Sequence, residues 1–474
     1  MATLNTAFNI ATGALNADQA ALTVVSNNVA NANTAGYTRE VATFEENDPV
    51  TINGASYGEG VTMAGGVSQR DLVLEQALQQ QNQVASASSA RLTTLQQVQT
   101  IFNQVTTADS SSSTSATNGI EQDMSQFFDS LSSLEASPAD TALRQQVLTS
   151  ATDLAGDFNT AASQLSAQQT SLGQQTASLV TQVNSLTQSL AGLNQQIQSA
   201  DPNSDAGTLE DQRQQDLQQL SQLVGIHQIQ TENNGIEITT SNGALLVSGN
   251  QSFSLSTASV SGSLQIYDSE GNNITTSLTS GGGQIGGLLT VSAQDIPQMQ
   301  SALDTLAYDL GTAVNTQNEA GSDANSNPGI AVFNLPATAT GAASQISVNL
   351  TDPSQIAAAV SGAGSSDDTN LLAMANLQNQ TIIGGDTPSD YYSGFVTTVG
   401  SLVSGVSTQN AAQEASVSQL QNQINSLSSV NLNEEASSLE TFEQSYESAS
   451  KIFTVLNQVM TAALNLGVET TYTS

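Results

Sequence analysis

The stretch LNTAFNIATGALNADQAALTVVSNNVANA, residues 4–32, places apolar side chains at alternating steps of four and three residues. LNEEASSLETFEQSYESASKIFTVLNQVMTAA, residues 432–463, repeats this spacing at the other end of the chain. Such spacing is typical of the a/d seam of supercoiled helices, and only Asp18 and Glu435 put a charge into it. Asn433 is expected to cap the second helix. The two stretches therefore predict long terminal helices that pair as a coiled coil.

A helix of about 30 residues is about 45 Å long and only marginally stable without partners. Pairing the two terminal helices leaves Ile10, Val24, Ile452, Val455 and Val459 largely exposed, so neighbouring copies of the chain are the natural cover. An ordinary coiled-coil stalk would show the same pattern. The residues expected at the assembly interface are Leu4, Phe8, Leu15, Leu22, Val25, Val29, Leu439, Phe442, Tyr446, Phe453 and Leu456.

Composition narrows the functional class. Of 474 residues only 10% are charged, and 6 Lys and Arg stand against 42 Asp and Glu, which gives a formal net charge of -36. Because cations supply the attraction to phosphate, nucleic acid and anionic membranes are poor partners. The chain has no cysteine, which excludes disulfides, thiolate metal sites and cysteine nucleophiles. No stretch reaches the roughly 18 apolar residues of a membrane span, so membrane insertion is not expected.

Motifs for catalysis or cofactor binding are weak. His227 is the only histidine, and we expect it to be a strand residue. Asp323, Asn325 and Asn327 resemble the start of a calcium loop, but an Asx-rich turn is the better interpretation. We predict no catalytic residue, no cofactor and no metal, and therefore no enzyme.

One glycine pattern resembles a dinucleotide-binding loop. Gly281, Gly283 and Gly286 satisfy G-x-G-x-x-G. Because Pro297 follows soon after, we expect a tight turn here and no helix of adequate length.

The middle of the chain predicts a mainly α fold with an inserted β domain. Helical periodicity covers most of it, including a helical hairpin over residues 127–168. From residue 226 the pattern alternates and is broken by pairs such as Asn-Gly, which is typical of a β-meander. The predicted nested, discontinuous domains are a terminal coiled-coil domain (1–35 and 431–474), a helical core domain (36–225 and 291–430) and an outer β-rich domain (226–290, alone or together with 330–352).

Residues 26–39, SNNVANANTAGYTR, end the N-terminal helix with turn-forming residues. This element resembles the N-terminal signature of the flagellar axial proteins, the family of rod, hook and hook-associated proteins. The matching positions are Asn27, Asn28, Ala30, Asn31, Thr34, Gly36 and Tyr37, while Ala35 stands where the family usually has Pro. Residues 209–220 (LEDQRQQDLQQL) and 430–436 (VNLNEEA) are similar to elements of the hook-associated members.

The resemblance implies a structural subunit of the bacterial flagellum that joins hook to filament. It also implies partners: other copies of the chain in a ring or helical polymer, hook protein, a second junction protein, and a cytosolic chaperone on the C-terminal helix. The expected location is extracellular, reached by type III export without a cleaved signal peptide. Two alternatives stay open: another axial protein, such as a hook or distal rod subunit, and a secreted adhesin or hydrolase that uses the β domain.

Overall fold

The computed structural model describes residues 2–52, 54–102, 119–199, 207–260, 262–364 and 366–469. The chain divides into two units. The first consists of residues 1–83, 182–255 and 414–474, and the second of residues 84–181 and 256–413. Each unit is described separately below. The domain boundaries predicted from the sequence stay a prediction.

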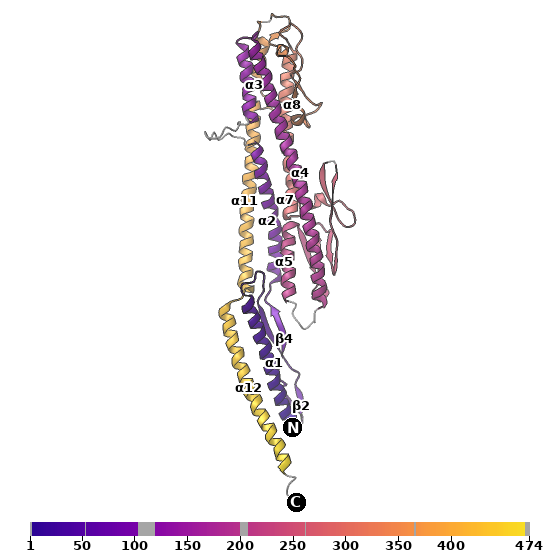
Figure 1. Cartoon of the computed structure of the whole chain (residues 1–474), viewed down its shortest axis with the longest axis vertical. Helices are drawn as coiled ribbons and strands as arrows, with labels where there is room; N and C mark the ends of the chain where they lie inside the picture. Colours follow the sequence, from indigo (N-terminus) through magenta and orange to yellow (C-terminus); the bar gives the residue numbers. More distant parts are fainter. Residues whose placement is uncertain are drawn as a thin grey trace. The chain divides into compact units, whose positions relative to one another are not determined.

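The first unit contains both ends of the chain. Helix α1 (Ala2–Asn31) packs against α12 (Leu432–Glu469), and the two run in opposite directions (Figure 1). Asn28 of α1 bonds to Glu435 near the start of α12, whereas the ring of Phe8 lies 4.7 Å from that of Phe453 further along α12. The expected terminal helices and their packing are confirmed; a supercoil between them stays a prediction.

A β-ribbon lies against α1. Strand β1 (Glu40–Glu46) pairs antiparallel with β4 (Val61–Ser68), and the short strands β2 (Val50–Ile52) and β3 (Ala55–Tyr57) form a second pair within the same connection. The ribbon approaches the helix closely at Gly66. A Cβ atom on this residue would lie only 3.4 Å from the side chain of Val24 of α1.

The rest of the first unit is a helix and a small sheet. Helix α5 (Gly207–Leu223) leads into a four-stranded antiparallel sheet with strand order β5-β6-β7-β8. Its strands are β5 (Ile226–Gln230), β6 (Ile236–Thr240), β7 (Leu245–Ser248) and β8 (Gln251–Ser252), with a 3-10 turn η1 (Glu232–Asn234) after β5. The side chain of Asn194, near the end of α4 (Thr141–Ser199), donates to the carbonyl oxygens of Ile236 and Gly249, at 2.8 and 3.0 Å, which fixes the sheet to α4. The predicted β-meander and the strand position of His227 are confirmed.

The second unit is mainly helical. Its long helices are α2 (Leu72–Phe102), α3 (Ile120–Glu135), α4 (Thr141–Ser199), α8 (Ile296–Glu319) and α11 (Pro388–Ser428); α2, α4 and α11 also contribute residues to the first unit. The shorter helices are α6 (Thr275–Thr279), α7 (Gly283–Thr290), the π turn η2 (Val291–Asp295), α9 (Ala342–Gln345), the 3-10 turns η3 (Pro353–Gln355) and η4 (Asn376–Asn379), and α10 (Thr369–Ala375).

Small strand pairs complete the second unit. They are β9 (Ser256–Val260) with β10 (Ser263–Tyr267), β11 (Gly321–Ser322) with β14 (Ala359–Val360), and β12 (Phe333–Asn334) with β13 (Ser347–Val348). The core of the unit includes the apolar residues expected from the helical hairpin: Phe127, Phe128, Leu131, Leu134, Val147, Leu154 and Phe158 are buried, and Leu143 packs against them. The predicted hairpin is thus confirmed as α3 and α4.

The expected tight turn at the glycine pattern is present between α6 and α7, where Gly282 has a φ of +89° and the amide of Gly281 donates to the carbonyl oxygen of Leu278, but the expectation that no helix of adequate length follows is wrong. Helix α7 begins at Gly283, and the chain continues through η2 into α8 without leaving helical structure. Pro297 does not interrupt it, because it lies in the first turn of α8, where proline's missing N–H group is tolerated. The Asx-rich turn is confirmed: Asp323 accepts bonds from the amides of Asn325 and Asn327, at 2.8 and 2.7 Å.

Arg144 holds a loop of the second unit in place. Its guanidinium is buried and donates to the carbonyl oxygens of Pro138 and Ile356, both at 2.7 Å. We expect Arg144→Met to lower the free energy of unfolding of this unit by about 3 kcal/mol, because the change leaves buried carbonyl groups without a donor. Urea unfolding followed by circular dichroism measures the loss. Lys451→Met is the matched control, since Lys451 is exposed and should change stability by less than about 0.5 kcal/mol.

Candidate functional site

The sequence motif at the end of α1 folds into a hydrogen-bonded cluster centred on Asn28. This side chain is only 1% exposed. Its amide nitrogen donates to the carbonyl oxygen of Glu40 at 2.7 Å and to the carboxylate of Glu435 at 3.0 Å. Its oxygen accepts from the hydroxyl of Tyr37 at 2.9 Å and from the backbone amide of Glu40 at 3.0 Å. Asn28 therefore uses its full bonding capacity to join the end of α1, the start of β1 and the start of α12.

Glu435 is the charged seam residue of the second terminal helix, and the structure explains its presence. The residue is 1% exposed, and Arg39 donates to it at 2.7 Å while also bonding Glu434 at 2.7 Å. A buried carboxylate is tolerated when its oxygens are paired with a cation and a further donor, as here. The expected cap is corrected: Asn431, rather than Asn433, accepts from a first-turn amide, because α12 already begins at Leu432.

The other motif residues shape the turn after α1. Asn31 bonds to Asn27 through both backbone and side chain, and Thr34 bonds to Asn31. Gly36 has a φ of +78°, and a Cβ atom there would lie 2.3 Å from the side-chain nitrogen of Gln215. Glycine is required at this position both by its backbone conformation and by the neighbouring side chain.

Tyr37 is held in its donor form. Burial raises the pKa of its phenol to about 12, and the nearby carboxylates of Glu40, Asp211 and Glu435 act in the same direction. The phenol therefore remains protonated near neutral pH and keeps its hydrogen bond to Asn28.

The turn is also anchored to α5. Asp211 accepts from the backbone amide and the hydroxyl of Thr38, at 3.1 and 2.7 Å, and from Arg70. Gln215 donates to the carbonyl oxygen of Ala35 at 3.1 Å. The segment of residues 209–220 thus supplies a contact for the motif through Asp211, although no local sequence pattern indicates that the two segments meet.

The terminal helices carry the residues predicted for assembly. Val25 is buried; Leu4, Phe8, Leu15, Leu22, Leu439, Phe442, Phe453 and Leu456 are partly buried, and Val29 and Tyr446 are exposed. On α12, Ile452, Val455 and Val459 are 56%, 57% and 49% exposed. These three residues follow one another at steps of three and four, so they share a face of the helix. We call them the α12 stripe.

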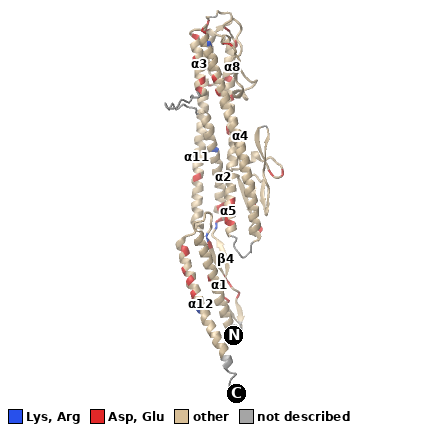
Figure 2. Cartoon of the chain, viewed as in Figure 1, with Lys and Arg blue, Asp and Glu red and all other residues tan. Residues whose placement is uncertain are grey.

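The α12 stripe is uncharged, whereas the rest of the chain is strongly acidic. Figure 2 shows few cationic positions among many acidic ones. Arg39, Arg70 and Arg91 each bind carboxylates, and Arg144 and Arg213 bind backbone carbonyl oxygens. Lys451 is exposed and pairs only with Glu447, one turn away on the same helix. The arginines therefore serve to fix the fold.

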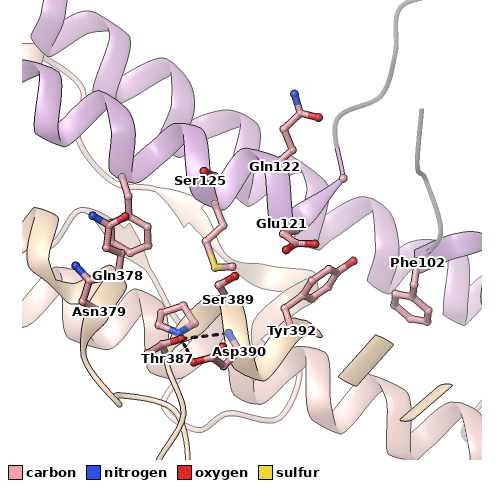
Figure 3. Close-up of a pocket in the computed structure, with 14 residues that line it drawn as sticks. Phe102, Glu121, Gln122, Ser125, Gln378, Asn379, Thr387, Ser389, Asp390 and Tyr392 are labelled. Atoms are coloured by element: carbon pink, nitrogen blue, oxygen red, sulfur yellow. Dashed lines mark hydrogen bonds between the residues drawn. The ribbon is translucent and has the colours of Figure 1, made fainter. Parts of the chain in front are cut away.

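A hollow of about 700 Å³ lies in the second unit between the starts of α3 and α11. Figure 3 shows Glu121, Gln122 and Ser125 on one side and Asp390 and Tyr392 on the other. The carboxylate of Asp390 accepts from the hydroxyl of Thr387 at 2.7 Å, in the capping turn of α11. The hydroxyl of Thr387 also accepts from the backbone amide of Asp390 at 3.2 Å, so this pair of bonds caps the start of α11. Among the residues that the structure describes, no three His, Cys, Asp or Glu side chains are grouped to hold a metal.

The chain is similar in sequence to two flagellar protein families. Residues 95–333 match the family model of the flagellar hook-associated protein FlgK helical domain, and residues 8–38 match that of the flagella basal body rod protein. The chain is 27% identical to flagellar hook-associated protein 1 of Escherichia coli strain K12, across 98% of this chain and 100% of the relative. It is also 27% identical to flagellar hook-associated protein 1 of Bacillus subtilis strain 168, across 95% and 96%.

Similarity extends to a solved structure. The fold is similar to that of the flagellar hook junction protein FlgK from Burkholderia pseudomallei, with a TM-score of 0.64 and 20% sequence identity, across 73% of this chain and 99% of that one. Within the described part of the chain, no helix has the length and apolar character needed to cross a membrane.

Asn28 and Asn27 offer a matched pair for testing the cluster. We expect Asn28→Ala to lower the local stability of the α1–α12 pair by about 2–4 kcal/mol, because it removes the acceptor of the Tyr37 hydroxyl and the donor to Oε2 of the buried Glu435, which keeps only its bond to Arg39. Asn27 is exposed and bonds only to Asn31 among the described contacts, so Asn27→Ala should cost about 0.5 kcal/mol. Hydrogen exchange of the α1 and α12 amides measures both changes. Equal effects of the two variants would contradict the role of Asn28.

Proposed function

Because the chain belongs to the flagellar hook-associated protein FlgK family, it is a structural component of the bacterial flagellum, and we propose that it assembles in the zone that joins hook to filament. The relatives are structural flagellar proteins, which agrees with a role that requires no catalysis. The match over the helical domain favours this assignment over a hook or rod subunit, since the match to the rod protein model is confined to residues 8–38.

The observation that supports assembly is the α12 stripe. Ile452, Val455 and Val459 remain exposed although α1 packs against α12. A run of half-exposed branched side chains on a terminal helix is costly in water and is characteristic of a surface that another protein covers. Ile10 of α1, 36% exposed, adds a similar contact on the partner helix. We propose that neighbouring copies of the chain bury these residues in the flagellum.

The contacts inside the chain have a different role in this proposal. Phe8, Phe442 and Phe453 make ring contacts within the first unit, Phe442 with Phe44 of β1. They order the terminal helices and so create the surface on which the stripe lies. Of the predicted interface residues, these aromatic ones act mainly by shaping the subunit, and residues on the outer face of α12 make the contacts between subunits.

The further partners are hook protein on one side and the second junction protein on the other. A cytosolic chaperone would bind the C-terminal helix before export, because the α12 stripe would otherwise be exposed to water. Export would proceed through the flagellar type III channel without a cleaved signal peptide, to the extracellular part of the flagellum. These assignments are supported by membership of the family and by the exposed stripe.

Val455→Asp tests the assembly surface. The side chain points away from α1, so the isolated subunit should fold normally, whereas a charge buried between subunits would cost several kcal/mol and block incorporation. We expect cells carrying this variant to keep hooks and to lose filaments and motility. Electron microscopy of isolated flagella and motility assays measure the outcome.

Asn457→Asp is the matched control, because it adds the same charge at an exposed polar position of α12. It should assemble normally. Phe453→Asp should also abolish assembly, but through disorder of the terminal helices and with the second unit intact. Normal flagella in the Val455→Asp strain would contradict the proposed surface.

A further inference from the structure

Two carboxyl groups meet between helices α3 and α4 of the second unit. Asp123, in the first turn of α3, is 5% exposed, and its side chain lies within hydrogen-bonding reach of Asp157 of α4. Their neighbours along the helices, Met124 and Phe158, belong to the hydrophobic core. One oxygen of Asp157, Oδ2, is buried and has no hydrogen-bond donor in the described part of the chain. An acidic pair of this kind is not needed for assembly at the terminal helices.

Two ionised carboxylates at this distance repel each other, because neither has a proton to donate. The arginines of this unit do not neutralise them: Arg91 is bound to Asp295, and Arg144 is bound to backbone carbonyl oxygens. A single proton held between the two groups removes the repulsion and turns it into a hydrogen bond. The N-terminal end of α3 favours negative charge on Asp123, so the proton belongs mainly to Asp157.

We propose that Asp123 and Asp157 share one proton, and that this proton is a pH-sensitive lock on the packing of α3 against α4. With the proton in place, a hydrogen bond between the carboxyl groups of Asp157 and Asp123 joins the two helices. When the proton leaves, the same two groups push the helices apart.

The electrostatic environment supports this arrangement. The pKa of Asp157 is raised to about 7, first by burial and then by Asp123 and, more weakly, Asp153 of α4. Tyr392 of α11 also faces the pair; burial raises its pKa to about 12, and Glu121 of α3 and Asp157 add to the shift. The phenol is therefore neutral while Asp157 titrates. The groups around Asp157 are thus acidic or neutral.

The sign of the pH effect follows from the direction of this shift. The pKa of Asp157 in the folded chain lies above its ordinary value of 3.8, so folding favours the protonated form. The stabilising contribution is complete below the ordinary value and is lost as the pH rises towards about 7. Because Asp157 is only partly buried, solvent screens part of this effect, and over that interval the unfolding equilibrium constant of the second unit should rise by about tenfold to a hundredfold from this pair alone.

Asp157→Asn tests the lock, because the amide can donate to Asp123 at every pH. Compared with the unchanged chain, this variant should have a similar unfolding constant at about pH 4 and one lower by about tenfold to a hundredfold at about pH 8. Urea-dependent hydrogen exchange of α3 and α4 amides, read by mass spectrometry on the full chain, measures this. Infrared spectra give a second readout: a protonated-carboxyl band in the unchanged chain at about pH 6 should be absent from the variant.

Asp129→Asn is the matched control, because Asp129 lies exposed on the same helix α3. It should remove one charge and leave the pH profile unchanged. The proposal is overturned if Asp157→Asn gives the same stability difference at both pH values, or if the carboxyl band is missing from the unchanged chain. It is also overturned if EDTA shifts the profile, since a metal ion rather than a proton would then neutralise the pair. None of these results bears on flagellar assembly.

Discussion

The structure of the first unit depends on the burial of one amide side chain, that of Asn28. Its four hydrogen bonds reach three separate segments of the chain, and one of them ends on a carboxylate that has almost no access to water. In such a site a polar group is tolerated only when all its bonding positions are filled, so the position of each partner is restricted. The packing of α1 on α12 is therefore specified by directional bonds as well as by apolar contact.

Much of this fold follows from local sequence patterns. The heptad spacing of residues 4–32 and 432–463 predicts the terminal helices, and the clustered aromatic and branched residues of 127–158 predict the core of the helical hairpin. These predictions succeed because residues three and four positions apart share a face of a helix, so the spacing of apolar residues along the sequence indicates which face is buried. The glycine pattern at 281–286 predicts the turn before α7 but not the helix that follows it, because a proline in the first turn of a helix leaves the helix intact.

The contacts of the motif could be predicted only in part. A charge at Glu435 in an apolar seam requires a cation, and a chain with six cations offers few, so Arg39 could have been considered. Nothing in the sequence connects Gln215 with Ala35, or Asp211 with Thr38, because these pairs are brought together by the course of the chain through α5. Local patterns encode helices well, whereas bonds between distant polar residues depend on the finished fold.

The bonds that join Asn28 of α1 and Arg39 of the following segment to α12 link residues 407 and 396 positions apart in the chain. Bringing the ends of so long a loop together carries a large entropy penalty unless the intervening residues are already compact. The contact between the two extremities should therefore form late in folding and be among the first to open. An order of events is thus built into the connectivity: the body of the molecule matures first, and its two ends close last.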